Sequence, residues 1–185
     1  MGCAEYLNEK DFKSILAYRE SNEFKDYLNK GEMGETIAIL VAEKLGWKST
    51  GFKPAYHGFD NVFRDGEKIV VVIEAKERED KLGPETLSTD KQGHVQAEPD
   101  WILAKATRMQ DHNSALYADN PENKMLGREI QDKFERERFD EVRSVIIQTL
   151  PSTYDVYIWE YVNGKWEQAN FFEGSEIEKG LNGNG

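Results

Sequence analysis

The segment V-V-V-I-E-A-K-E at residues 70–77 constrains the fold of this chain more than any other part of its sequence. Its four β-branched residues predict a buried strand. Side chains alternate between the two faces of a strand, so Glu74 and Lys76 are expected side by side on one face. Glu-x-Lys alone is a weak signal, because exposed ion pairs at this spacing occur by chance and contribute little stability. The pair must therefore be interpreted together with the segments around it.

The flanking sequence predicts a mixed α/β domain. Asp65-Gly66 separates two apolar runs and indicates a hairpin, and apolar residues at helical spacing follow Glu32. The predicted order is α-α-β-β-β-α-α-β-β-β. We expect helices over 9–29, 32–45, 99–116 and 121–140, and strands over 47–54, 59–64, 68–76, 142–150, 154–161 and 165–172.

Size and composition suit one folded domain. The chain has 185 residues, of which 38% are hydrophobic, and this suffices for a core. We expect a single domain over 1–173, with its core at about 31–150 and a flexible Gly-, Asn- and Glu-rich tail over 174–185. No apolar run suits a membrane span, and no signal-peptide pattern is visible. The single cysteine, Cys3, excludes internal disulfides, so a cytoplasmic location is expected.

The net charge limits the partners. At −11, the chain repels polyanions at long range. A nucleic-acid substrate would therefore require a local basic patch or bound cations. Lys91, Lys105 and Arg108 are the candidates for such a patch, although they are equally compatible with ordinary surface charge.

A second carboxylate precedes the Glu-x-Lys strand. Asp60 stands at the start of the strand before it, in H-G-F-D-N-V-F. Asp60 and Glu74 can supply oxygen ligands to Mg²⁺. A metal ion there would lower the pKa of a bound water and neutralise charge on a phosphate. Lys76 could then orient or deprotonate the water, or hold the phosphate.

These motifs together resemble the PD-(D/E)XK nuclease superfamily. H-G-F-D followed by I-V-V-V-I-E-A-K matches its signature, with Phe59 in place of the proline. The segment K-Q-G-H-V-Q-A-E-P-D-W-I at 91–102 is similar to the part after the Glu-x-Lys strand in some branches, which include toxin domains. The resemblance covers about residues 31–150. It implies a restriction-endonuclease-like α-β-β-β-α-β core with a mixed sheet flanked by helices, here with an extra N-terminal helix and a C-terminal β-hairpin.

The resemblance also implies roles for individual residues. Asp60 and Glu74 would bind Mg²⁺ or Mn²⁺, with Glu35 as an auxiliary ligand, often through water. Lys76 would be the catalytic lysine, and Gln96 would contact the metal shell or the substrate. Lys91, Lys105 and His94, which lies in the same loop as Gln96, are expected near the substrate. The implied function is metal-dependent hydrolysis of a nucleic acid, with DNA as the expected substrate and RNA as the alternative. The implied assembly includes a possible homodimer.

The hairpin register decides whether the carboxylates can meet. A two-residue turn at Asp65-Gly66 would place Asp60 opposite Val71, on the face away from Glu74. The site therefore requires an odd-length loop. A three-residue loop over 64–66 would satisfy this condition, and a five-residue loop over 65–69 would place Asp60 directly opposite Glu74.

Two other functions remain open at this point. The fold could be an inactive or inhibitor-type module whose acidic surface binds a basic protein. Alternatively, the chain could be a nuclease toxin domain neutralised by a cognate immunity protein. The first would lack metal binding, whereas the second would share the chemistry proposed above.

Overall fold

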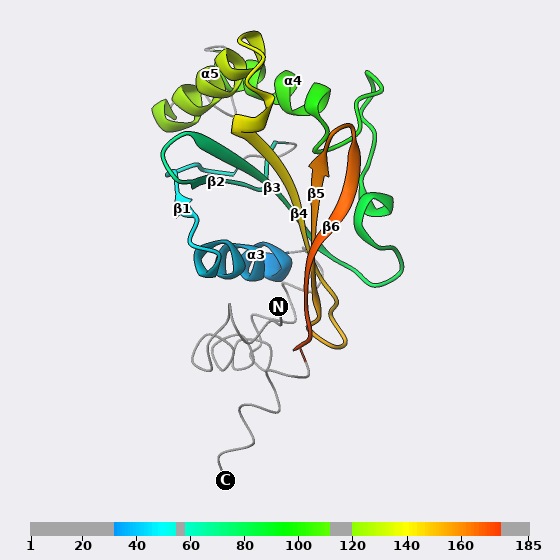
Figure 1. Cartoon of the computed structure of the whole chain (residues 1–185). Helices are drawn as coiled ribbons and strands as arrows, with labels where there is room; N and C mark the ends of the chain where they lie inside the picture. The colour runs from blue at the N-terminus through cyan, green and yellow to red at the C-terminus, as the bar shows by residue number, and fades with distance from the viewer. Residues whose placement is uncertain (1–31, 55–57, 112–119, 175–185) are drawn as a thin grey trace.

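A six-stranded mixed sheet forms the middle layer of the computed structural model, which describes residues 32–54, 58–111 and 120–174 (Figure 1). The strands follow one another across the sheet in sequence order, and only β3 and β4 are parallel. They are β1 (Lys48–Ser49), β2 (Asn61–Asp65), β3 (Ile69–Glu77), β4 (Val142–Thr149), β5 (Val156–Val162) and β6 (Lys165–Phe172).

Helices cover the sheet on both sides. α3 (Glu32–Lys44) lies on one face, and α4 (Pro99–Met109) and α5 (Pro121–Glu135) lie on the other (Figure 1). Two short 3-10 helices, η2 (Gly83–Thr86) and η3 (Phe139–Glu141), complete the described elements. The mixed α/β class is confirmed, as is the predicted order of helices and strands along the described part of the chain. The predicted helix over 9–29 lies outside the described residues. The helix predicted over 99–116 ends at Met109, earlier than predicted, and residues 112–116 lie outside the described residues.

Some boundaries differ from those predicted. The helix predicted to reach residue 140 ends at Glu135, because Glu137 adopts a left-handed backbone with φ 55° that cannot continue an α-helix. The strand predicted over 47–54 contains only two paired residues. Gly174, placed in the predicted tail, is buried and donates its N–H to Asp155 at 2.8 Å. The rest of that tail lies outside the described residues.

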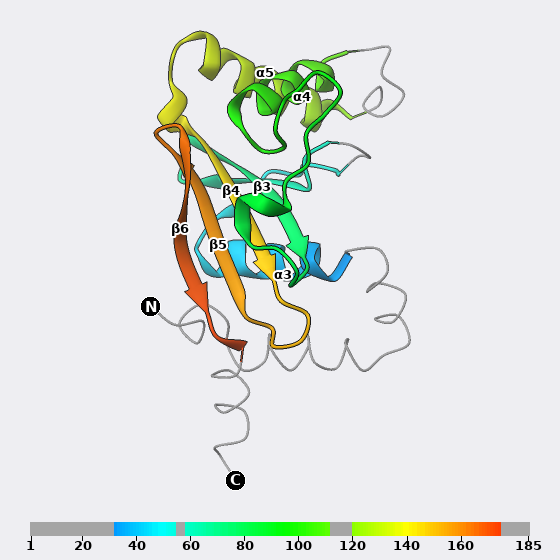
Figure 2. The ribbon, with the colours of Figure 1, turned by 90° about the vertical axis from the view of Figure 1, so that its right-hand side faces the viewer.

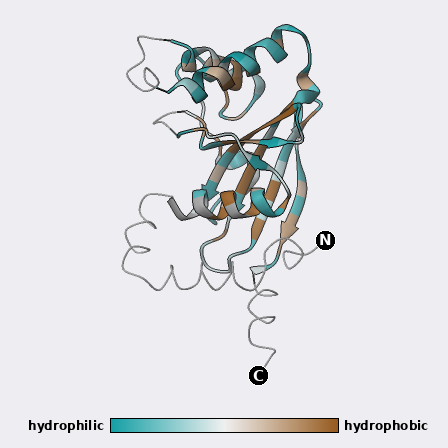
Figure 3. Cartoon of the chain, turned by 90° about the vertical axis from the view of Figure 1, so that its left-hand side faces the viewer, coloured by the Kyte–Doolittle hydropathy of each residue, from teal (hydrophilic) through white to brown (hydrophobic). Residues whose placement is uncertain are grey.

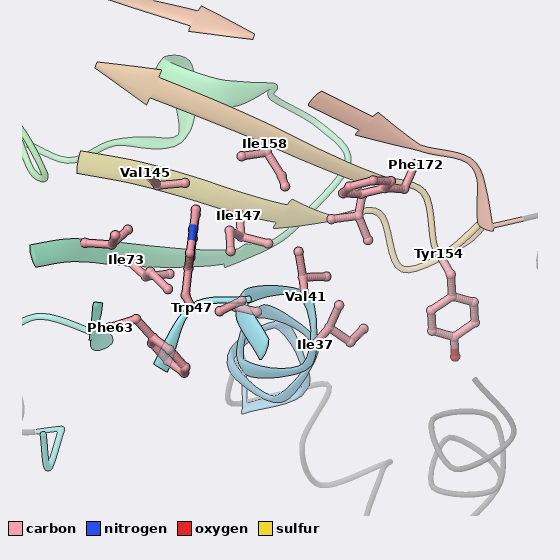
Figure 4. Packing of buried hydrophobic residues seen from close by; sticks show 14 residues of the cluster. Ile37, Val41, Trp47, Phe63, Ile73, Val145, Ile147, Tyr154, Ile158 and Phe172 are labelled. Atoms are coloured by element: carbon pink, nitrogen blue, oxygen red, sulfur yellow. The ribbon is translucent and has the colours of Figure 1, made fainter. Parts of the chain in front are cut away.

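Alternation along β3 builds two separate cores. Val71 and Ile73 pack with α3, as Figure 4 shows for Ile73 together with Ile37 and Val41 of the helix. Val70 and Val72 face the α4 and α5 layer. Hydrophobic colour accordingly concentrates on the strands and the inward helix faces in Figure 3. Glu74 and Lys76 continue the Val70–Val72 series, so they face the α4 side.

The hairpin between β2 and β3 has the odd loop that the carboxylates require. Arg64 pairs with Val70, which is the register predicted for a five-residue loop over 65–69. Asp65 and Ile69 also pair, so the unpaired turn contains only the three residues 66–68. Gly66 adopts φ 71°, which a residue without a Cβ tolerates. The same register places Asp60, just before β2, opposite Glu74. The expectation that a simple two-residue hairpin is absent is confirmed.

The segment 78–98, between β3 and α4, crosses the face of the sheet on which α4 lies (Figure 2). It contains η2 and an isolated antiparallel bridge between Thr89 and Val95. Among the described residues, no helix has the length and apolar character that a bilayer crossing requires.

Candidate active site

Three predicted residues meet at the end of β3. Lys76 Nζ donates to Glu74 Oε1 at 2.8 Å, as the period of two along the strand predicts. Asp60 Oδ2 accepts the backbone N–H of Ala75 at 2.8 Å, which fixes its carboxyl group beside that of Glu74. The Glu74 side chain is 4% exposed and that of Lys76 is 18% exposed. The site is therefore a largely buried group at the end of a central strand.

Gln96, from a distant part of the chain, hydrogen-bonds both Glu74 and Lys76. Its amide nitrogen donates to Glu74 Oε1, and its Oε1 accepts from Lys76 Nζ at 3.0 Å. The Thr89–Val95 bridge forms a small hairpin, in which the Gln96 N–H donates to the Ser88 carbonyl at 2.8 Å. This hairpin holds Gln96 over the end of β3.

An unusual backbone conformation follows Gln96. Ala97 is fully buried and adopts φ 64°, a left-handed conformation that costs roughly 1–2 kcal/mol for a residue with a Cβ. Its carbonyl accepts the hydroxyl of the buried Ser144 on β4. The chain can then turn from the hairpin into α4, whose first residue is Pro99. Ser144 thus supports the conformation that places Gln96 in the site.

Burial controls the electrostatics of the carboxyl pair. Burial, followed by the charge of Asp60, raises the pKa of Glu74 to about 8, although Lys76 opposes the shift. Burial also raises the pKa of Asp60, against the lowering effects of the Ala75 N–H and of Lys76. Two carboxylates in one buried site repel each other. The pair therefore retains a proton at neutral pH unless a cation compensates the second charge.

One oxygen of the pair has no donor. Glu74 Oε2 is buried and receives no hydrogen bond when both carboxyl groups of the pair are ionised, a costly state for a carboxylate oxygen. Two adjacent carboxylates with an unsatisfied oxygen fit Mg²⁺, which commonly binds one or two carboxylates and keeps several waters. Asp60 and Glu74 are the residues that would hold it.

Glu35 does not complete a group of three ligands. It lies half-buried on α3, which packs on the opposite face of the sheet from Glu74. Within 32–54, 58–111 and 120–174, no three His, Cys, Asp or Glu side chains form a group that could hold a metal ion. The auxiliary role of Glu35 therefore stays a prediction.

His94 has a local partner in the structure. Its Nδ1 lies 3.2 Å from Asp90 Oδ2, and its backbone N–H donates to Asp90 Oδ1 at 2.9 Å. Asp90 also accepts the N–H of Gln92. These contacts organise the turn of the small hairpin, and His94 makes no hydrogen bond to Glu74 or Lys76 there. The expected position of His94 near the substrate stays a prediction.

The predicted basic residues lie together beside the site. A cleft of about 510 Å³ is lined by Lys91 from the small hairpin, by Lys105 and Arg108 from α4, and by Gln96. Lys105 Nζ lies 5.3 Å from the ring centroid of Trp101, which is buried as expected for a core residue. Burial and the neighbouring Arg108 lower the pKa of Lys105. The cleft thus places positive charge next to Gln96.

Gln148 is a supporting residue that sequence reasoning missed. It is fully buried on β4, directly opposite Lys76 in the parallel ladder. Its amide nitrogen donates to the carbonyls of Arg78 and Lys81 at 2.9 and 2.7 Å, and its Oε1 accepts the Gly83 N–H at 2.8 Å. The available signal was the set of polar residues Ser144, Gln148 and Thr149 on either side of the apolar run 145–147 of β4.

No protein-family model matches this chain, and no curated protein or solved structure matches it. The architecture and the site geometry therefore define its class as a mixed α/β domain with a buried carboxylate–lysine–glutamine group. The motif resemblance to PD-(D/E)XK nucleases stands as a basis for the proposal below.

Proposed function

We propose that this protein is a metal-dependent nuclease of the restriction-endonuclease-like fold, which hydrolyses phosphodiester bonds in nucleic acid. The observation that carries the proposal is the group formed by Asp60, Glu74 and Lys76. It joins the buried carboxyl group of Glu74, which has an unsatisfied oxygen, and the partly buried carboxyl group of Asp60 to an ammonium held 2.8 Å from Glu74. The order α3-β1-β2-β3-α4 and the parallel return through β4 agree with such a core.

The carboxylates would bind the metal ion, which when bound supplies positive charge that acidifies water and neutralises phosphate. In the hydrolysis, the oxygen of a water forms a bond to phosphorus, the P–O ester bond breaks, and the leaving oxygen takes up a proton. Lys76 would hold the phosphate as an ammonium, or accept the proton of the water as a neutral amine. Gln96 contacts both Glu74 and Lys76, so it would orient these two side chains.

A cleavage assay tests this proposal. The purified chain is incubated with duplex DNA, single-stranded DNA and total RNA, each with Mg²⁺, Mn²⁺ or EDTA. We expect cleavage with either metal and none with EDTA. Glu74→Gln and Lys76→Ala should each reduce the rate by at least about 100-fold, the range of a positioned acid or base.

Matched variants separate chemistry from folding. Glu67→Gln and Lys68→Ala change the same residue types in the exposed turn of the same hairpin, and both should cleave like the wild type. Calorimetry with Mn²⁺ provides a second readout, because Glu74→Gln should weaken metal binding. An absence of both cleavage and metal binding would refute the proposal and favour an acidic protein-binding module.

A further inference from the structure

The cleft beside the active site brings together three cations from two separate segments. Lys91 belongs to the hairpin over 88–96, whereas Lys105 and Arg108 lie on α4, three residues apart and therefore on one helix face. Asp90 is the only acidic residue that lines the cleft among the residues described. The lining therefore has a net positive charge, although the chain as a whole carries −11.

Among the described residues, these three cations make none of the ion pairs with carboxylates that other basic side chains of this protein make. Arg64, Lys133 and Arg143 each contact a glutamate at 2.8 Å or less. Across the part of the chain that the structure describes, no carboxylate lies within 4.0 Å of the charged groups of Lys91, Lys105 or Arg108. Unpaired cations gathered in a cleft of an acidic protein provide a binding site for an anionic ligand.

The cleft adjoins the candidate active site through one shared residue, Gln96. Gln96 lines it, and the same side chain contacts Glu74 and Lys76. An anion bound by the three cations would therefore lie next to the buried carboxylates. Phosphates that neighbour a scissile phosphate along one strand would occupy this position.

The volume of the cleft restricts the form of the nucleic acid. At about 510 Å³, it falls within the range of roughly 300–1,000 Å³ typical of pockets that hold one small ligand. A space of that size holds a nucleotide-sized segment of one strand, whereas a duplex could contact the cleft only from outside, with the phosphates of one of its strands. The Trp101 ring is buried and covered by Lys105, so it does not offer a face for base stacking.

We infer that this cleft binds one single strand of nucleic acid through its phosphates, with little contribution from base stacking. The inference rests on the proposed function, since it makes the single strand the substrate of the same site. Recognition by three cations should depend strongly on salt. For single strands, the slope of log K against log salt is about −0.7 for each phosphate neutralised, so three contacts give a slope of about −2.

Fluorescence anisotropy with labelled 12-nucleotide DNA and RNA strands and the matching duplex tests this inference. The full chain is used in EDTA, so that binding is measured without cleavage. We expect a single strand to bind at least tenfold tighter than the duplex, with a salt slope of about −2. The DNA and RNA strands identify the preferred sugar.

Charge variants locate the binding site. Lys105→Ala with Arg108→Ala should weaken single-strand binding at least tenfold and reduce the slope to about −0.7. Lys105→Arg with Arg108→Lys retains both charges and should bind like the wild type. Lys48→Ala with Lys68→Ala removes the same charge from exposed positions at β1 and the hairpin turn, and should change binding little.

The outcomes separate this inference from the proposed nuclease activity. Tighter binding of the duplex, or an unchanged slope in the Lys105 and Arg108 double alanine variant, overturns the single-strand cleft even if metal-dependent cleavage occurs. Single-strand binding with the expected slope supports the cleft, and if the chain then cleaves no substrate with Mg²⁺ or Mn²⁺, only the proposed activity is overturned.

Discussion

Replacing Glu74 with glutamine tests the central electrostatic claim, that the buried carboxyl pair retains a proton in the metal-free protein. Glutamine has nearly the same shape as glutamate, but it neither ionises nor repels Asp60. The variant therefore removes the titration of Glu74 while it leaves the packing of β3 nearly unchanged.

The expected effect follows from the raised pKa of Glu74. Its ordinary value is 4.5, and the folded protein raises it to about 8, mainly through burial. Between these values the folded state holds a proton that the unfolded chain has lost. The stability that this proton contributes is complete below pH 4.5, and it is lost as the pH rises through about 8. The slope is at most about −1.4 kcal/mol per pH unit, with a ceiling of about 5 kcal/mol over the whole window.

Urea unfolding monitored by tryptophan fluorescence measures this effect in EDTA between pH 5 and pH 8. We expect the wild type to lose several kcal/mol of unfolding free energy across the range, and Glu74→Gln to lose much less. The variant should therefore exceed the wild type in stability at pH 8, and the difference should shrink toward pH 5. Glu67→Gln, in an exposed turn, should follow the wild type throughout.

Metal addition provides the second half of this prediction. Mg²⁺ at 100 times its dissociation constant should stabilise the wild type at pH 8 by about 2.7 kcal/mol, and it should stabilise Glu74→Gln much less. A stability difference between wild type and variant that stays constant from pH 5 to pH 8 would refute the buried, protonated pair.

Three further substitutions test the surroundings of the site. Ser144→Ala removes the hydroxyl that bonds the Ala97 carbonyl, so urea unfolding should show a loss of about 1–3 kcal/mol, and cleavage should slow without weaker strand binding in anisotropy. Gln148→Leu leaves two carbonyls and one N–H without partners, and hydrogen exchange over 78–83 should accelerate, whereas unchanged protection would contradict the anchoring role. Gly127→Ala would place a Cβ 2.5 Å from the Ala106 carbonyl oxygen between α5 and α4. The resulting loss of about 1–3 kcal/mol should exceed the gain of about 1 kcal/mol in helix propensity, and a higher melting temperature would refute this tight packing.

The strand positions and the charged pair were predictable because they depend on local chemistry. The β-branched run fixed β3, and the period of two placed Glu74 and Lys76 on one face, where the structure has them. Pairing geometry also showed that Asp60 could reach them only through an odd-length loop. Which odd loop forms was decided by the observed register, which pairs Arg64 with Val70.

Other features of the site depend on contacts between residues far apart in the sequence. Gln96 reaches Glu74 because the Thr89–Val95 bridge and the left-handed Ala97, supported by Ser144, redirect the chain toward β3. Local propensity does not predict the left-handed backbone of Ala97, since an alanine disfavours that conformation unless its surroundings stabilise it.

Glu35 and Gln148 show that a sequence motif alone does not identify the residues around the site. Glu35 matched a motif, yet α3 packs on the far face of the sheet, whereas Gln148 matched no motif and lies opposite Lys76 in the ladder. The sequence by itself determined which residue types were available and which strand face they share. Only the tertiary structure decided how deeply Glu74 is buried, and burial is the physical cause of its raised pKa, because removal of water penalises the charged form.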